Sequence, residues 1–318
     1  MAMQVQWLRE RAHRRTPCKR NGDTMTGPAN NLYERWQEQI QQELNARVKA
    51  HQHEVRQTKA LHARAAGAPE PLILIGDGDS WFDYPLPDPL HATDVLEGLR
   101  TAGQPTPIIL KLAHYSDATT TLLGVNKRNR LIAQLQDPAN GPIDALLFSG
   151  GGNDVVGDQF RFWLNDASAV GNDPAQGVDI RRLGNIFGVV ESAYLDLIGI
   201  RDQFAPHAPI FVHAYDFAIP TGVSACHLAG PWLRPSLVDR GWPDLAPGTL
   251  IVKSILVQFR VMLRRLASDP AHNMVLVETQ GTLAPDDWAN ELHPTGAGFG
   301  KIAACFRAAL AARFAHRI

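Results

Sequence analysis

Five short apolar runs constrain the fold of this chain more than any other feature of its sequence. None of them alternates regularly between apolar and polar residues, which is typical of strands that are buried on both faces. Helices and loops of a parallel sheet bury its strands in this way. The predicted strands span residues 71–76, 107–112, 143–148, 209–213 and 274–277.

Helical patterns fill the intervals between these runs. Apolar residues at helical spacing predict helices over residues 119–135, 183–203, 250–266 and 298–314. Strands that alternate with helices predict a parallel sheet with helices on both faces. We therefore predict an α/β fold, a three-layer α/β/α sandwich around a five-stranded parallel sheet with the flavodoxin-like strand order. Because ligands bind such sheets beyond the carboxyl ends of the strands, we expect the functional residues directly after the apolar runs in the sequence.

The residues before the first predicted strand differ in composition from the rest of the chain. Residues 1–29 begin with a cluster of arginines and lysines and predict a flexible basic tail. An alternative interpretation makes this tail the functional part, acting at a membrane surface. Residues 30–66 contain neither Gly nor Pro and predict a helical extension, followed by the main domain at 71–318.

The predicted extension carries one apolar stripe, in which large residues recur at a four-residue step. The stripe consists of Leu32, Trp36, Ile40, Leu44 and Val48. We expect it to lie against the main domain or against a second copy of the chain. The second case would make the protein a homo-oligomer through its N-terminal helix.

Two long connections leave the carboxyl ends of the third and fourth predicted strands. They span residues 155–182 and 216–248 and are rich in aromatic and polar residues. Long loops at this edge of a sheet usually form lids or substrate walls. We expect an apolar or sugar-stacking substrate wall, with plain packing of a lid as the alternative. The candidate wall residues are Trp81, Trp163, Trp232 and Tyr215.

Composition narrows the function classes. The formal net charge of the 318 residues is -1, so the chain does not look like a nucleic-acid binder. The three cysteines are far apart, which argues against a disulfide framework and for a reducing compartment. The sequence shows no secretory signal and no transmembrane segment. We therefore expect a cytoplasmic protein, with export by a non-Sec route left open.

A serine directly follows the first predicted strand, in the sequence Gly78-Asp79-Ser80. A serine in a strand-to-helix turn is held clear of the sheet, where its hydroxyl can reach a substrate. The hydroxyl becomes a useful nucleophile when an imidazole takes its proton. The alternative is that Asp79 and Ser80 only cap the next helix.

A glycine-rich segment follows the third predicted strand and ends in Gly151-Gly152-Asn153-Asp154. An Asn amide at this place can donate a hydrogen bond to a developing oxyanion, a contribution of about 3–4 kcal/mol. The alternatives are a simple turn or a phosphate cradle. A P-loop is excluded because no Lys-Ser or Lys-Thr pair follows the glycines.

A histidine follows the fifth predicted strand, just before the last helix, in the pair His293-Pro294. A lone loop histidine is usually a solvated surface residue. Its position at the same edge of the sheet as Ser80 makes it the candidate base, because an imidazole can exchange a proton near neutral pH.

These three segments together resemble the SGNH hydrolase superfamily, the GDSL esterases and lipases. Gly78-Asp79-Ser80 matches the GDS motif, Gly151-Gly152-Asn153-Asp154 matches GxND, and His293-Pro294 matches the end of DxxHP. The resemblance covers residues 71–316. It implies an ester hydrolase with Ser80 as nucleophile, His293 as base and Asn153 in the oxyanion hole. It implies no cofactor and no metal, and a small-molecule, lipid or other acylated substrate.

Two positions depart from the family pattern. Asp117 stands where the family has a glycine whose backbone N–H binds the oxyanion, and its own N–H can serve equally. Asn290 stands where the family has its acid. Glu291, Asp287 or Asp286 would then have to reach the imidazole, or a Ser–His dyad would work without an acid. The alternative function is an SGNH-fold binding protein with weak or no turnover.

Overall fold

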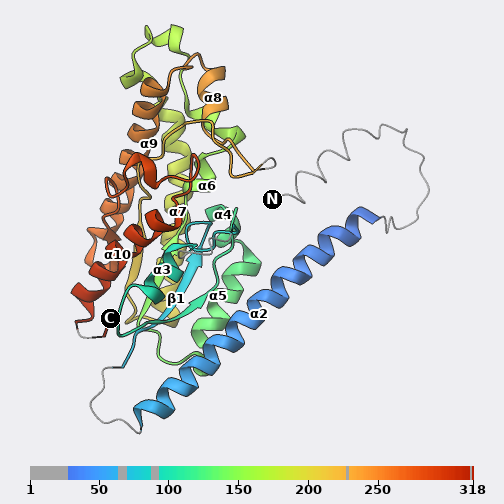
Figure 1. Cartoon of the computed structure of the whole chain (residues 1–318), viewed down its shortest axis with the longest axis vertical. Coiled ribbons are helices and arrows are strands. Elements are labelled where there is room, and N and C mark those ends of the chain that lie inside the picture. Colours follow the sequence, from blue (N-terminus) through green and yellow to red (C-terminus); the bar gives the residue numbers. More distant parts are fainter. Residues whose placement is uncertain (1–27, 64–69, 87–92, 227–228, 316) are drawn as a thin grey trace.

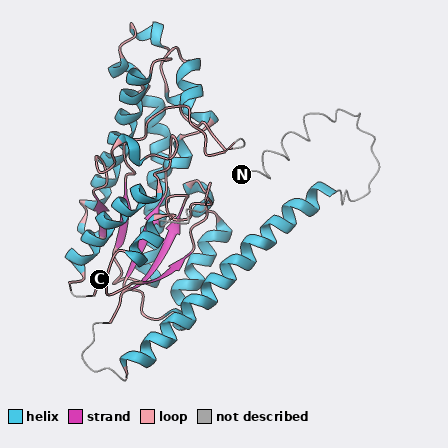
Figure 2. Cartoon of the chain, in the orientation of Figure 1, coloured by secondary structure: helices cyan, strands magenta, loops and turns pink. Residues whose placement is uncertain are grey.

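Five parallel strands form one sheet in the order β2-β1-β3-β4-β5, which confirms the predicted fold class (Figure 2). The computed structural model describes residues 28–63, 70–86, 93–226, 229–315 and 317–318, so nearly all of the predicted tail lies outside the described residues. Each predicted strand is present within two residues of its predicted bounds. The strands are β1 (Ile73–Gly78), β2 (Ile108–Lys111), β3 (Ala145–Ser149), β4 (Ile210–His213) and β5 (Met274–Val277).

Helices cover both faces of the sheet and complete the three layers (Figure 1). On one face, α3 (Val95–Thr101) packs against α10 (Gly296–Arg313). On the other face, α7 (Ile180–Phe204) packs between α5 (Val125–Gln136) and α9 (Leu245–Ala267). Right-handed crossovers between parallel strands produce this distribution.

The predicted helix at residues 119–135 is two helices in the structure. The short α4 (Thr119–Leu122) ends before Gly124, and Gly124 is the N-cap of α5. The Gly124 N–H returns to the Thr121 carbonyl at 3.2 Å, which closes the first helix. A Cβ at this position would approach the Thr120 carbonyl oxygen at 3.1 Å, so the break favours glycine.

Two helices, α7 and α9, are long and apolar enough to cross a membrane by length and composition. In this structure they are core helices. Their inner faces carry fully buried residues such as Leu183 and Ile251, and α9 packs on β4 and β5. This packing accounts for part of their apolar character, and several large apolar residues of the outer faces are exposed, among them Ile180, Leu250 and Val261.

The predicted helical extension is a single helix, α2 (Pro28–His62), which runs along the edge strand β2 (Figure 1). Leu44 of the predicted stripe is buried and Val48 is half-buried, so the stripe faces the main domain. The side chain of Leu32 lies outside the described residues. Near the other end, Val55 packs with Ile73 and Ile108.

The two long connections pack against each other at the carboxyl end of the sheet. The first holds three 3-10 turns, η2 (Asp158–Trp163), η3 (Ala167–Val170) and η4 (Pro174–Gln176), and the second holds α8 (Arg234–Asp239). Gly157 N–H donates to the Trp232 carbonyl at 3.2 Å, and Ala167 N–H donates to the Arg240 carbonyl at 2.9 Å. We call the two connections together the lid insertions.

Candidate active site

Ser80 and His293 meet at the carboxyl end of the sheet, although 213 positions separate them in the sequence. The distance from Ser80 Oγ to His293 Nε2 is 2.8 Å. Ser80 is 8% exposed and His293 is 7% exposed, so the pair lies beneath the surface. This is the spacing that a nucleophile and its general base require.

The turn that carries Ser80 is built around the carboxylate of Asp79. It accepts hydrogen bonds from Trp81 N–H at 3.0 Å, Ser149 Oγ at 2.8 Å and Tyr215 Oη at 2.6 Å. Burial raises the pKa of Asp79 to about 6. The strands before and beside the turn approach closely, since a Cβ at Gly78 would lie 2.4 Å from the Ser149 carbonyl oxygen. The Asp79 carboxylate therefore holds the turn in place, and the Ser80 hydroxyl contacts His293 and not Asp79.

A second histidine, His213, lies behind this network. Its Nε2 is 2.9 Å from Ser149 Oγ, and its Nδ1 accepts the Tyr215 N–H at 3.3 Å. Because Nδ1 is an acceptor, the ring proton is on Nε2 and points at Ser149. Burial lowers the pKa of His213 to about 3, so the ring is neutral. His213 supports the Asp79 network and does not reach Ser80.

Asn153 lies on the short helix α6 (Gly152–Val155), next to Ser80. Gly151, the residue before this helix, has a φ of 109° in the left-handed region, which favours glycine. Asn153 Nδ2 donates to the Asp117 carbonyl at 2.9 Å, which uses one of its two N–H groups. Asp154 ties the helix to the neighbouring loop through the Thr119 N–H at 2.8 Å. Among the described residues, the second Asn153 N–H has no acceptor, so it is available for a substrate oxygen.

The backbone of Asp117 contacts the site through the Asn153 amide, while the Asp117 carboxylate is engaged elsewhere. Its carboxylate pairs with Lys127 of α5. Among the described residues, neither the Ser80 N–H nor the Asp117 N–H has a hydrogen-bond acceptor. These two backbone N–H groups are therefore available as hydrogen-bond donors.

Asn290 contacts the imidazole of His293 at the ring nitrogen that does not face Ser80. Its Oδ1 lies 3.0 Å from His293 Nδ1 and also accepts the backbone N–H groups of Leu292 and His293, each at 3.0 Å. Its Nδ2 donates to Tyr84 Oη at 3.2 Å. Because two backbone donors fix Oδ1 as an acceptor, Nδ1 carries the imidazole proton and Nε2 faces Ser80 unprotonated. Burial lowers the pKa of His293 to about 3.

The three carboxylates expected as substitutes for the acid do not contact the imidazole. Glu291 is fully buried, and its carboxylate accepts four backbone N–H groups of the second lid insertion, at 2.6–3.0 Å. Asp287 pairs with Lys301 at 2.7 Å. Asp286 is exposed. The structure does not support a shifted acid, and the arrangement is a Ser–His dyad oriented by Asn290.

Two hollows meet at Ser80. The inner cavity, of about 70 Å³, lies between the lid insertions and helices α7 and α9. The outer cleft, of about 380 Å³, opens beside the second lid insertion. Ser80, Asn153 and His293 line both. The inner cavity is lined mostly by apolar side chains, among them Val155, Phe160, Phe187, Ala218, Leu233, Val252, Ile255 and Phe259.

Three of the four expected wall residues line these hollows. Trp81 and Tyr215 line the inner cavity, and Trp232 lines the outer cleft. The Trp232 ring also contacts His293 edge-on, with ring centroids 5.5 Å apart. Trp163 lines neither, because its indole N–H donates to the Val155 carbonyl at 2.9 Å and supports the wall from behind.

Sequence analysis missed Tyr84. Its ring lies over the imidazole of His293, with centroids 4.7 Å apart, and its hydroxyl receives the Asn290 amide. The only signal was its place four residues after Ser80, and that spacing does not reveal a partner so far along the chain. Tyr84 holds both the base and the residue that orients it.

No protein-family model matches the sequence, and no curated protein matches it either. Similar solved structures include an extracellular lipase from Streptomyces rimosus, 14% identical, covering 74% of this chain and 98% of its own, with a TM-score of 0.48. A phospholipase A1 from Streptomyces albidoflavus is 17% identical and covers 76% and 99%, with a TM-score of 0.41. An acetyl xylan esterase from Geobacillus stearothermophilus is 17% identical and covers 76% and 96%, with a TM-score of 0.39.

Proposed function

We propose that this chain is a serine hydrolase of the SGNH type that cleaves carboxylic esters through an acyl-enzyme on Ser80. The observation that carries the proposal is the 2.8 Å contact between Ser80 Oγ and the unprotonated Nε2 of His293. The Asn153 amide lies beside the same hydroxyl and supplies the donor that acyl transfer requires.

The proposed mechanism uses these groups in turn. Ser80 Oγ attacks the acyl carbon as its proton passes to His293 Nε2. The N–H groups of Ser80, Asp117 and Asn153 bind the oxyanion. His293 then returns the proton to the leaving alcohol as the ester bond breaks. A water molecule, deprotonated by His293, releases the carboxylic acid and restores the Ser80 hydroxyl.

The two hollows suggest how an ester lies across Ser80. The inner cavity is small and apolar, so it suits the acyl group, with about 0.8 kcal/mol gained for each buried methylene. The outer cleft is wider and carries the Tyr84 and Tyr115 side chains, so it suits the alcohol and the incoming water. We propose short apolar acyl esters as the preferred substrate class.

Hydrolysis of p-nitrophenyl esters, from acetyl to dodecanoyl, tests the proposal. The wild-type chain should hydrolyse the shorter esters, and Ser80→Ala should lower kcat by up to about 10⁶-fold. Circular dichroism of both proteins checks that folding is unchanged. Hydrolysis that persists in Ser80→Ala at the wild-type rate would rule out the mechanism.

One observation favours a second candidate, a binding protein with the same fold. Asn290 offers no negative charge to a forming imidazolium, so His293 lacks the stabilisation that a carboxylate gives in the chymotrypsin-type triad. Such a protein would bind an ester in the inner cavity without cleaving it. Calorimetry with a non-hydrolysable ketone analogue, in parallel with the turnover assay, separates the two candidates.

A further inference from the structure

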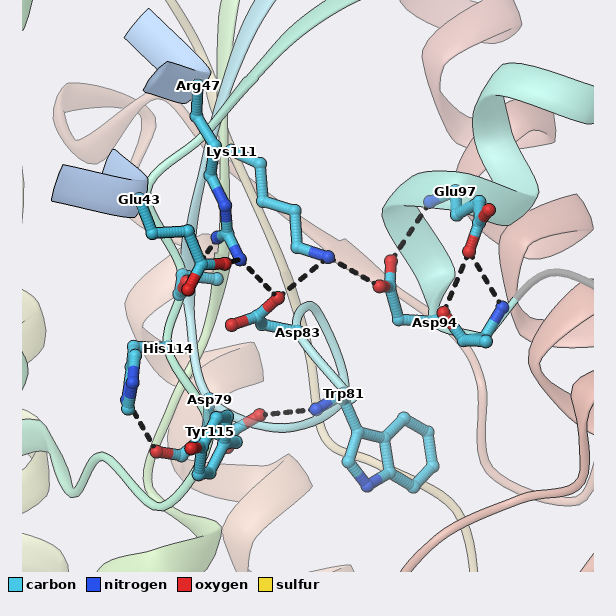
Figure 3. Close-up of polar contacts among 12 residues, drawn as sticks. Glu43, Arg47, Asp79, Trp81, Asp83, Asp94, Glu97, Lys111, His114 and Tyr115 are labelled. Carbon is cyan, nitrogen blue, oxygen red and sulfur yellow. Dashed lines mark hydrogen bonds and ion pairs between the residues drawn. The ribbon is translucent and has the colours of Figure 1, made fainter. Parts of the chain in front are cut away.

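The N-terminal helix α2 reaches two separate segments of the site through one side chain. Arg47 Nη2 donates to Asp83 Oδ1 at 2.9 Å (Figure 3). Arg47 Nη1 donates to the Ala113 carbonyl at 3.0 Å. Glu43, one turn earlier on α2, pairs with the same guanidinium. We propose, on the basis of the proposed function, that Arg47 is a positioning residue that joins the nucleophile turn to the oxyanion loop.

The first of these segments is the nucleophile turn, residues 79–83. Phe82 N–H and Asp83 N–H both donate to the Asp79 carbonyl at 3.0 Å, so the turn moves as a unit with Ser80 inside it. The Asp83 carboxylate is buried and is shared between Arg47 and Lys111, the latter at 2.8 Å. Lys111 is itself shared with Asp94 at 2.6 Å. Without Arg47, the buried Asp83 carboxylate would depend on Lys111, which also pairs with Asp94.

The second segment is the oxyanion loop, residues 113–118. Ala113 begins it, and the next residue, His114, donates its N–H to the Gly78 carbonyl at 2.9 Å. Near the end of the loop, the Asp117 carbonyl accepts the Asn153 amide at 2.9 Å, and the Asp117 N–H is one of the proposed oxyanion donors. Trp36 of α2 also contacts the His114 ring edge-on, with centroids 6.2 Å apart. The helix therefore holds this loop at two points.

The geometry of a guanidinium explains why an arginine suits this position. Its planar fork presents several N–H groups in fixed directions, so it can bind a carboxylate and a carbonyl at once. Arg47 would in this way fix the distance between the nucleophile and the oxyanion donors. That distance affects the catalytic rate, because a misplacement of the reacting groups by about 1 Å can lower the rate about 10²-fold.

Other contacts hold α2 to the domain independently of Arg47. Val55 packs with Ile73 and Ile108, and His51 Nε2 lies 3.2 Å from the Asn140 carbonyl. These contacts lie at the opposite end of the sheet from Ser80. Loss of Arg47 should therefore disturb the two active-site segments and leave the helix in place.

Three full-length variants test the inference: Arg47→Ala, Arg47→Lys and, as a control, Arg56→Ala on the exposed face of the same helix. Arg47→Ala should lower kcat by about 10- to 100-fold with little change in KM. Arg47→Lys should recover part of kcat, because an ammonium can hold Asp83 but does not reproduce the fork. Arg56→Ala should match the wild type.

Hydrogen exchange of the same proteins supplies a readout that does not depend on turnover. In Arg47→Ala, amide exchange should rise in residues 79–83 and 113–118 and stay unchanged in residues 48–60. A rise throughout α2 would assign Arg47 a general structural role and overturn the inference. Wild-type kcat in Arg47→Ala, with Ser80→Ala inactive, would overturn this inference alone. Absence of any Ser80-dependent turnover in the wild type would overturn the proposed function together with it.

Discussion

The side-chain oxygen of Asn290 accepts a hydrogen bond from Nδ1 of His293 at 3.0 Å. An amide at this position could instead turn its NH₂ group toward the ring and force the wrong tautomer, which is the defect of the Asp-to-Asn change in chymotrypsin-type enzymes. Here the N–H groups of Leu292 and His293 prevent that rotation. The base is correctly oriented but lacks a charged partner.

We therefore expect Asn290→Asp to raise turnover. The carboxylate would accept the same three N–H groups and would stabilise the imidazolium that forms during attack. A hydrogen bond to a charged group contributes about 1–1.5 kcal/mol more than a neutral one, so kcat should rise about tenfold. Steady-state hydrolysis of a p-nitrophenyl ester measures the change, with Asn290→Ala as the matched loss of the acceptor. A slower Asn290→Asp enzyme would show that Asn290 is not a substitute for the acid.

The pH dependence of the wild type follows from burial of the base. His293 works only when neutral, and burial lowers its pKa to about 3. The kcat/KM value should therefore hold as pH falls through 6.5 and decline only at more acidic pH. In Asn290→Asp the new negative charge raises the pKa of His293, so the acidic limb should move upward. An acidic limb near pH 6.5 in the wild type, with folding intact by circular dichroism, would contradict this account.

Removal of the oxyanion donor should affect kcat far more than KM. Asn153→Ala should lower kcat by about 10²–10³-fold, the typical cost of losing one such donor. Gln159→Ala is the matched control, because the Gln159 amide donates to the Asn153 backbone carbonyl at 3.0 Å and, in the described part of the chain, does not bond the Asn153 side chain. Its kcat should fall much less. Equal losses in the two variants would mean that the Asn153 side chain does not touch the reacting oxygen.

The positions of Ser80, Asn153 and His293 could be predicted because parallel strands end at one edge of the sheet. Each of the three follows a short apolar run, and the alternation of strands and helices was enough to bring them together. Asp117 followed in the same way from the end of β2. No knowledge of the lid insertions or of α2 was needed for this part of the site.

The partners of Glu291 and Arg47 could not be predicted. Glu291 accepts the N–H of Gly222 and those of residues 232–234 at the start of α8, where no periodic pattern in the sequence fixes the chain. The apolar stripe of α2 indicated which face of the helix is buried but not where along β2 it docks. The register of that docking decides that Arg47 meets Asp83, and it depends on packing across the whole domain.

Glu291 should prove to be a structural residue. Glu291→Gln weakens four buried hydrogen bonds to backbone N–H groups, so the free energy of unfolding should fall by about 1–3 kcal/mol. Urea denaturation measures the loss, with the exposed Asp286→Asn as a control that should stay within about 0.5 kcal/mol. If Glu291→Gln kept its stability and instead shifted the acidic limb of the pH profile, Glu291 would be the acid after all.

The central claim is that Ser80 is an activated nucleophile, and a fluorophosphonate probe tests it most directly. The wild-type chain is treated with the probe, digested and mapped by mass spectrometry, with Ser80→Ala and His293→Ala alongside. The account predicts one adduct on Ser80 in the wild type, none at that position in Ser80→Ala, and much slower labelling in His293→Ala. A folded wild-type protein that forms no adduct on Ser80, or forms it equally fast without His293, would contradict the claim.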